Sequence, residues 1–156
     1  CHEQSMPVDF SLVGPCINEE YLAQVTKYFG GRVNLRGPKR GNDLCQAYLD
    51  ADIVIMPSPK EGFGLVTVEA LQHMRPVIAK NISAQREIFA PFNNDKPGFL
   101  VDSNSNELAT QQAVEALKEF SQNTNLRRRL SISAQDARKF YNQIDLSNQF
   151  ANIALS

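Results

Sequence analysis

The sequence predicts a single α/β domain over residues 1–156, in which helices cover both faces of a doubly wound parallel sheet. Two observations carry this prediction. Short apolar runs alternate along the chain with longer segments whose apolar residues recur at helical spacing. The short runs are rich in β-branched residues and are bounded by glycine or proline, which is typical of strands in a buried parallel sheet.

Five strands are expected, near residues 9–14, 33–37, 53–57, 76–79 and 98–101. The third contains an unbroken apolar run at residues 53–56, which indicates burial on both faces. Ligands of such a sheet bind at the carboxyl ends of the strands. The loops at these ends are therefore expected to form the rim of one pocket, and the ends themselves are marked by Gly14, Gly37, Ser58 and Lys80.

Helices are expected between the strands. Asn18 and Asn42 are the predicted N-caps of the first two. The next two are expected over residues 65–74 and 83–89, with residues 90–97 as a loop. Asn104 and Glu107 resemble a capping box at the start of a fifth helix. Two amphipathic helices and a short tail close the chain; the predicted core residues of these helices are Ala109, Ala113, Ala116, Leu117, Phe120, Leu126, Leu130, Ala134, Ala137 and Tyr141.

The composition argues against several classes of function. The chain is 42% hydrophobic and 21% charged with a net charge of −1, so it has no basic field for nucleic acid. Its apolar runs are far shorter than the roughly 20 residues that a membrane-spanning helix needs. The three cysteines lack metal-ligand spacing and there are only two histidines. We therefore expect reduced thiols, a cytoplasmic location and no metal site.

The helix expected after Gly64 offers an anion-binding terminus. Its first amide groups should have no intrahelical partners, and they lie at the positive end of the helix dipole. The residues that carry these amides are Leu65, Val66 and Thr67.

Two carboxylates bracket this terminus. Glu61 lies on the preceding loop, and Glu69 lies about one and a half turns into the helix, so both are expected to approach one mouth. Two acceptors beside a row of donors suit a sugar hydroxyl, a ribose and a phosphate.

The string EGFGLVTVE at residues 61–69 resembles the E-x7-E signature of the family-4 (group 1) retaining glycosyltransferases. Two glutamates at this spacing are unspecific alone, but the string lies between an apolar strand and Pro-Val-Ile, as it does in that family. The resemblance extends over nearly the whole chain, from the strand that ends at Gly14 through Val33 to Gly37, Ala51-Asp52, Pro57-Ser58, Pro76 to Ala79, Glu87-Ile88 and Gly98 to Val101.

The resemblance implies the Rossmann-like C-terminal half of an enzyme with the GT-B fold, a retaining hexosyltransferase. Such a domain binds a UDP-, GDP- or ADP-sugar and needs no metal or other cofactor. Glu61 takes the catalytic position at the reacting carbon of the donor sugar, and Glu69 holds the ribose. The remaining donor-binding positions are Arg36, Gly37, Gly62, Phe63, Gly64, Leu65, Val66 and Thr67.

The sequence departs from that family in three places. Met74 stands where the family has a glycine that ends the helix, so strain or a different helix end is expected. Residues 81–86 replace a glycine-rich turn that contacts the donor sugar. The family's first strand, whose loop carries an arginine and a lysine for the donor pyrophosphate, has no match. We therefore expect a sheet that lacks this strand, with a gap between the strands that end near Gly14 and Met56.

The start at Cys1 and the missing acceptor-binding domain suggest a fragment that is inactive by itself. The expected partners are a nucleotide sugar, an acceptor glycan, lipid or small molecule, the enzyme's own N-terminal domain and, for the full enzyme, a membrane surface. Two alternatives from other classes stay open: a non-catalytic nucleotide- or glycan-binding module, and a nucleotide-sugar epimerase-like domain.

Overall fold

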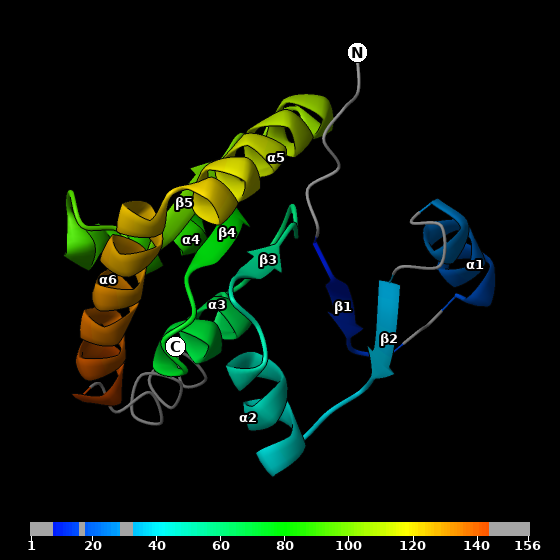
Figure 1. Cartoon of the computed structure of the whole chain (residues 1–156), viewed down its shortest axis with the longest axis horizontal. Coiled ribbons are helices and arrows are strands. Elements are labelled where there is room, and N and C mark those ends of the chain that lie inside the picture. Colours follow the sequence, from blue (N-terminus) through cyan, green and yellow to red (C-terminus); the bar gives the residue numbers. More distant parts are fainter. Residues whose placement is uncertain (1–7, 16–17, 29–32, 144–156) are drawn as a thin grey trace, which may run out of the picture. The chain divides into compact units, whose positions relative to one another are not determined.

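The structure, a computed structural model, describes residues 8–15, 18–28 and 33–143 (Figure 1). The chain divides into two compact units, unit 1 (Cys1–Asp50) and unit 2 (Ala51–Ser156), and each is described by itself. Strands alternate with helices, and all three strand pairs of the described residues are parallel. The predicted α/β class with parallel pairing is confirmed. The strands form one sheet in each unit, so a single domain with one gapped sheet stays a prediction.

Unit 1 is built from β1 (Phe10–Val13), α1 (Glu19–Tyr28), β2 (Val33–Gly37) and α2 (Gly41–Leu49). The two strands pair in parallel with Phe10 opposite Val33, and the ladder closes with a hydrogen bond of 3.0 Å from the Gly14 amide to the Gly37 carbonyl. Both strands and the helix after Asn18 lie where the sequence predicts them.

The start of α2 differs from the prediction. The N-cap position is occupied by Arg40, whose backbone is extended, and no side chain caps the helix. Gly41 has a φ of +52°, a conformation that glycine adopts without steric cost, so the chain turns into the helix one residue before Asn42. The prediction of Asn42 as N-cap is therefore wrong.

Unit 2 contains a three-stranded sheet in the order β3-β4-β5. Its elements are β3 (Val54–Met56), α3 (Leu65–Gln72), β4 (Val77–Lys80), α4 (Ser83–Phe89), the 3-10 helix η1 (Ala90–Phe92), β5 (Gly98–Val101), α5 (Asn106–Gln122) and α6 (Thr124–Gln143). The central strand β4 is buried along its whole length. The predicted strands and the helix over residues 83–89 are confirmed, whereas the predicted loop at residues 90–97 contains η1.

Burial of the third strand on both faces is not observed. β3 is an edge strand of its sheet, and Ile55 keeps 36% of its surface exposed. An edge strand has a neighbour on one side only, so an apolar run alone did not distinguish it from a central strand.

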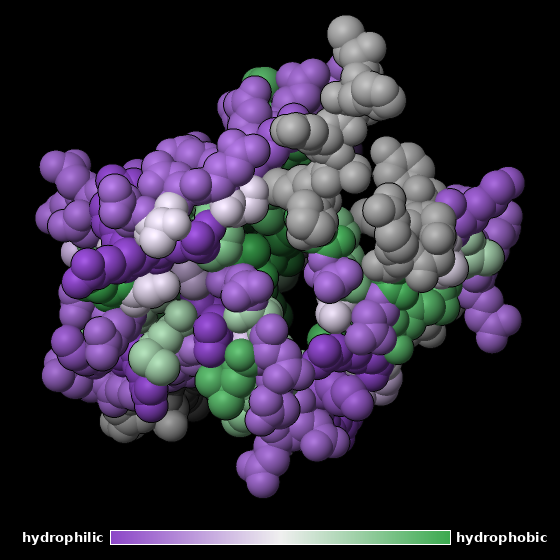
Figure 2. Space-filling view, in the orientation of Figure 1, coloured by the Kyte–Doolittle hydropathy of each residue, from purple (hydrophilic) through white to green (hydrophobic). Residues whose placement is uncertain are grey.

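The core of unit 2 lies between its sheet and its helices. α3 packs against β3, β4 and α6, while α5 packs against β4, β5 and α6. All the predicted core residues of these last two helices are buried except Ala113, which is half-buried. The face of α5 and α6 that Figure 2 shows is mostly hydrophilic, although Leu108, Val114, Ile132 and Phe140 on these helices are exposed. No helix in the described ranges combines the length and apolar character needed to cross a bilayer.

The long helices are fixed at their ends by side chains. Ser105, rather than the predicted Asn104, is the N-cap of α5, because its hydroxyl accepts a hydrogen bond of 3.2 Å from the Leu108 amide. Asp102 orders the preceding turn by accepting the amides of Asn104 and Ser105 at 2.8 and 2.7 Å. α6 is tied to α4 by the Tyr141 hydroxyl, which donates to the Ile88 carbonyl at 2.6 Å.

The helix α3 ends in a left-handed turn at Met74, which has a φ of +59°. The Arg75 amide donates to the Ala70 carbonyl and the Met74 amide to the Leu71 carbonyl, both at 2.9 Å. These two bonds form a Schellman motif, whose left-handed position is normally glycine. Of the two expectations for Met74, the strained one is confirmed.

Candidate functional site

A pocket of about 390 Å³ opens where the loop between β3 and α3 meets the start of α4. β3 and β4 are adjacent parallel strands, so the loops after their carboxyl ends lie at the same edge of the sheet. This is the edge at which the sequence, through Ser58 and Lys80, predicts a rim. The pocket is lined by Pro59, Lys60, Glu61, Gly62, Ile82 and Ser83.

Two of the predicted site residues, Glu61 and Gly62, line this pocket. Glu61 is half-buried and Gly62 is exposed. Lys60 and Ser83 were not predicted, although both could have been found: Lys60 adjoins the motif, and Ser83 lies in the turn where the sequence departs from the family. Lys60 brings a positive charge to the rim beside Glu61.

The start of α3 supplies two amide groups. Gly64 is the N-cap, with a φ of +76° and ψ of 37°. The Thr67 amide donates to the Gly64 carbonyl at 2.9 Å, so the prediction that this amide lacks an intrahelical partner is wrong. A tight first turn of this kind satisfies a donor that an ideal α-helix leaves unpaired. The amides of Leu65 and Val66 have no hydrogen-bond partner among the described residues.

Close packing favours glycine at position 64, in addition to its φ. A Cβ at this position would lie 2.7 Å from Cδ1 of Ile88 and 3.1 Å from Nε2 of Gln85. No such neighbour surrounds Gly62, where a Cβ would meet open space. The loop therefore packs closely against α4 at Gly64, whereas nothing lies within 4 Å of a Cβ built at Gly62.

The other predicted residues of unit 2 are not among those that line the pocket. Phe63 is half-buried on the loop. Glu69 is half-buried in the second turn of α3, and its carbonyl accepts hydrogen bonds from the amide and from Nδ1 of His73, at 3.1 and 2.7 Å. A common mouth for the carboxylates of Glu61 and Glu69 stays a prediction.

Arg36 and Gly37 belong to unit 1. The guanidinium of Arg36 forms an ion pair of 2.7 Å with Asp50, and the Gln46 amide donates to the same carboxylate at 2.8 Å. The hydrogen bond from Arg36, followed by that from Gln46, lowers the pKa of Asp50 below its usual value of 3.8. Gly37 ends β2 with a φ of +62°. Joint action of these residues with the Glu61 loop stays a prediction.

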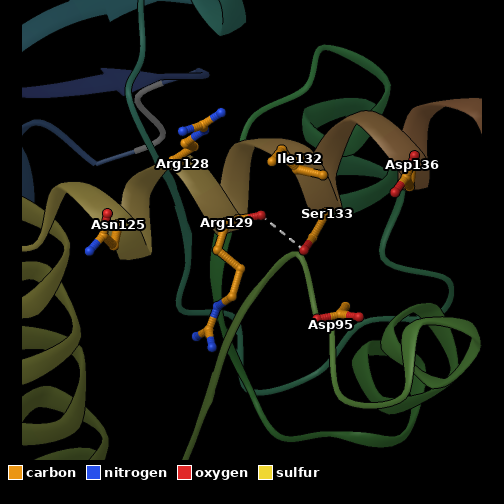
Figure 3. A pocket seen from close by; sticks show the side chains of 7 residues that line it. All are labelled: Asp95, Asn125, Arg128, Arg129, Ile132, Ser133 and Asp136. Carbon is orange, nitrogen blue, oxygen red and sulfur yellow. Dashed lines mark hydrogen bonds between the residues drawn. The ribbon is translucent and has the colours of Figure 1, made fainter.

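A second pocket, of about 330 Å³, contains none of the predicted site residues (Figure 3). Arg128 and Arg129, in a run of three arginines at residues 127–129, project from different sides of α6, and both are exposed. Arg127 differs, because its guanidinium donates to the carbonyls of Phe120 and Ser121 at 3.0 and 2.5 Å and so caps the end of α5. Of these three arginines, Arg127 therefore stabilises the end of α5.

Comparison with known proteins gives a consistent result. The family described as glycosyl transferases group 1 matches residues 12–137. The sulfoquinovosyl transferase SQD2 of Arabidopsis thaliana is 35% identical over 81 residues, which are 51% of this chain and 16% of that protein. The aligned part of the chain thus spans about a sixth of that relative.

Solved structures share the fold. The pneumococcal O-GlcNAc transferase GtfA, solved with UDP and GlcNAc, superposes with a TM-score of 0.70 at 20% identity, over 86% of this chain and 26% of that one. The C-terminal domain of a glycosyl transferase group 1 family protein from Francisella tularensis gives a TM-score of 0.65 at 28% identity, over 81% of this chain and 63% of that one.

Proposed function

Because the chain belongs to the group 1 glycosyl transferases, we propose that it binds a nucleotide diphosphate sugar and takes part in transferring that sugar, with retention of configuration, to an acceptor. The pocket at the carboxyl ends of β3 and β4 is the proposed donor site. One observation carries this proposal: Glu61 and Gly62 line a pocket together with the residues at the start of α4. The same loop leads directly into α3, whose first amides are those of Leu65 and Val66.

The proposed chemistry follows from the charges around the pocket. As the bond between sugar and diphosphate breaks, negative charge grows on the diphosphate and positive charge on the sugar carbon. The amides of Leu65 and Val66 and the dipole of α3 are fixed positive partners for the departing diphosphate. Groups that are already oriented stabilise this charge without reorganisation. Lys60 adds a cation at the rim.

The two glutamates have different proposed roles. Glu61, on the pocket wall, faces the sugar and stabilises the positive character of its reacting carbon. Glu69, in the second turn of α3, accepts hydrogen bonds from the ribose hydroxyls, each charged hydrogen bond contributing roughly 1.5 to 3 kcal/mol. Gly62 and Gly64 let the loop backbone approach the donor closely.

The proposed donor is a UDP-, GDP- or ADP-hexose. The UDP and GlcNAc in the pneumococcal structure support a nucleotide-sugar donor. Because the chain spans only part of its relatives, we propose that an N-terminal domain of the same enzyme supplies the acceptor site. We further propose that the sugar is transferred in the cytoplasm to a glycan, lipid or small molecule.

Steady-state kinetics on the full-length protein test these roles. Glu61→Gln keeps the shape of the side chain and removes its charge, so we expect nucleotide binding within a few-fold of wild type and a loss of about 10²-fold or more in turnover. Glu69→Gln should act mainly on binding, with donor affinity weakened by about 10- to 150-fold. Equal turnover of wild type and Glu61→Gln would remove Glu61 from catalysis, and nucleotide binding by a wild type without turnover would favour a binding module.

A further inference from the structure

A buried amide beside the proposed donor site has no hydrogen-bond partner. Gln85, on α4, is 1% exposed, and neither its Nε2 nor its Oε1 has a partner. The hydroxyl of Thr67, in the first turn of α3, is 0% exposed and also unpaired. Buried polar side chains are nearly always hydrogen-bonded in native proteins, because an unpaired one has lost its water without compensation.

Both groups adjoin Gly64, the N-cap of α3. The Gln85 amide packs against the face of Gly64 that a side chain would occupy, with Nε2 3.1 Å and Cδ 3.6 Å from that Cβ position. Thr67 is joined to Gly64 through its own amide. The unpaired amide of Gln85 thus lies against Gly64, three residues after Glu61 on the same loop.

We propose that Gln85 is a positioning residue for the Glu61 loop, an inference that rests on the donor site proposed above. When a nucleotide sugar occupies the pocket, the peptide groups between Gly62 and Gly64 rotate and pair with the Gln85 amide. A Cβ at Gly62 would have no neighbour within 4 Å, so there is room for these peptide groups to turn. The new pairing holds the Glu61 carboxylate against the sugar.

The chemistry of glutamine suits this role. Its amide offers two donors and an acceptor oxygen, so it can pair with a peptide carbonyl and a peptide N–H alike. A residue that only filled space between α3 and α4 would serve better as methionine or leucine, which have a similar size and no polar atoms to desolvate. In the ligand-free fold the unpaired Gln85 amide therefore lowers stability, and in the donor-bound state it forms hydrogen bonds with the loop.

Gln85→Met separates these two states. Without ligand, we expect the variant to melt about 2 to 4 °C higher than wild type, because an unpaired buried amide is replaced by an apolar group. Binding of UDP, GDP or ADP should stay within threefold. The kcat for release of nucleoside diphosphate from UDP-glucose, GDP-mannose or ADP-glucose, whichever the full-length protein uses, should fall about 10- to 100-fold. Stability and turnover thus change in opposite directions.

Ile88→Leu is the matched control. Ile88 also packs against Gly64, but the substitution adds and removes no polar group, so neither kcat nor melting temperature should rise or fall appreciably. A cycle with Glu61→Gln tests the route of action: if Gln85 works through Glu61, the double variant should be no slower than Glu61→Gln alone.

Unchanged kcat in Gln85→Met, or additive losses in the cycle, would overturn the proposal while leaving the donor site intact. If wild-type protein binds none of the nucleotides or nucleotide sugars, the proposed function fails and this inference fails with it. Gln85→Leu is the second variant; failure of both to fold would also overturn the proposal, because the amide would then be needed by the ligand-free fold.

Discussion

The two units of the chain differ in how much apolar surface they bury. Within the described part of unit 1, Tyr48 is the one buried apolar side chain, while Leu12, Val13 and Leu35 on its two-stranded sheet are 44%, 42% and 41% exposed. In unit 2 the central strand is fully buried, and α3, α5 and α6 all add buried side chains.

Because unit 2 buries more apolar surface, it is the unit better able to hold the side chains of a site in fixed positions. A two-stranded sheet is marginally stable by itself, whereas three strands packed on helices sustain a core. The residues that line the proposed donor pocket belong to unit 2. We therefore expect equivalent substitutions to cost more stability in unit 2 than in unit 1. Two pairs of substitutions and two pH profiles, one from each unit, test this expectation.

The largest effect is expected for Gly98→Ala compared with Gly14→Ala. The two glycines have similar φ values, +157° and +146°. A Cβ at Gly98 would collide with the carbonyl oxygen of Val77 and lie 2.7 Å from its nitrogen, whereas Gly14 has nothing within 4 Å. Gly98→Ala should lose more than about 4 kcal/mol of unfolding free energy, and Gly14→Ala about 1 to 3 kcal/mol. Urea denaturation followed by circular dichroism measures both; equal losses would contradict the comparison.

Leucine truncation gives the next largest contrast. Leu71 of α3 is 0% exposed and Leu35 of β2 is 41% exposed. Leu71→Ala removes buried methyl groups and leaves a cavity, so we expect a loss of about 2 to 5 kcal/mol. Leu35→Ala should cost less than about 1 kcal/mol. The same denaturation assay applies, and a Leu35→Ala loss as large as that of Leu71→Ala would show that unit 1 has a core of its own.

Tyr141 makes unit 2 sensitive to alkaline pH. Burial raises the pKa of its hydroxyl to about 12, above the ordinary value of 10.0. Its stabilising contribution is therefore complete below pH 10 and is lost as the pH rises through 12. Tyr141→Phe should cost about 1 kcal/mol at pH 7, because the Ile88 carbonyl loses its donor. The variant should also lose less stability than wild type between pH 10 and 12; parallel pH profiles would exclude this linkage.

The smallest effect is expected at the acid end of the pH range, in unit 1. The hydrogen bonds from Arg36 and Gln46 hold the pKa of Asp50 below 3.8. Their contribution is present above the unfolded pKa and is lost as the pH falls through the lower folded one. Asp50→Asn should therefore flatten the stability profile below about pH 4. Sensitivity of the difference to salt would be a further check.

Much of the fold was predictable because it depends on local spacing. The apolar run after Pro76 and the glycine at position 98 locate β4 and β5, and the five predicted core residues of α6 are all buried. The loop with Glu61 lines a pocket, and its position follows from a strand end and a helix start only a few residues apart; its role as a donor site stays a prediction.

Features that depend on three-dimensional neighbours were not predictable. Asn104 and Ser105 are both good caps, and only the path of the turn after Asp102 decides between them. The Thr67 amide is paired because Gly64 makes a tight first turn. Gln85 looks like an ordinary polar residue of a short helix until packing against Gly64 leaves its amide without water or a partner.

The left-handed turn at Met74 affects how the end of α3 opens locally. A left-handed φ costs a residue with a side chain roughly 1 to 2 kcal/mol, so we expect the Schellman turn at Met74, just after α3, to open more readily than the helix itself. In hydrogen exchange, the amides of Met74 and Arg75 should exchange through a local opening that leaves Val68 protected. The helix thus frays at one end and stays closed about 12 Å away, where its first turn faces the proposed donor.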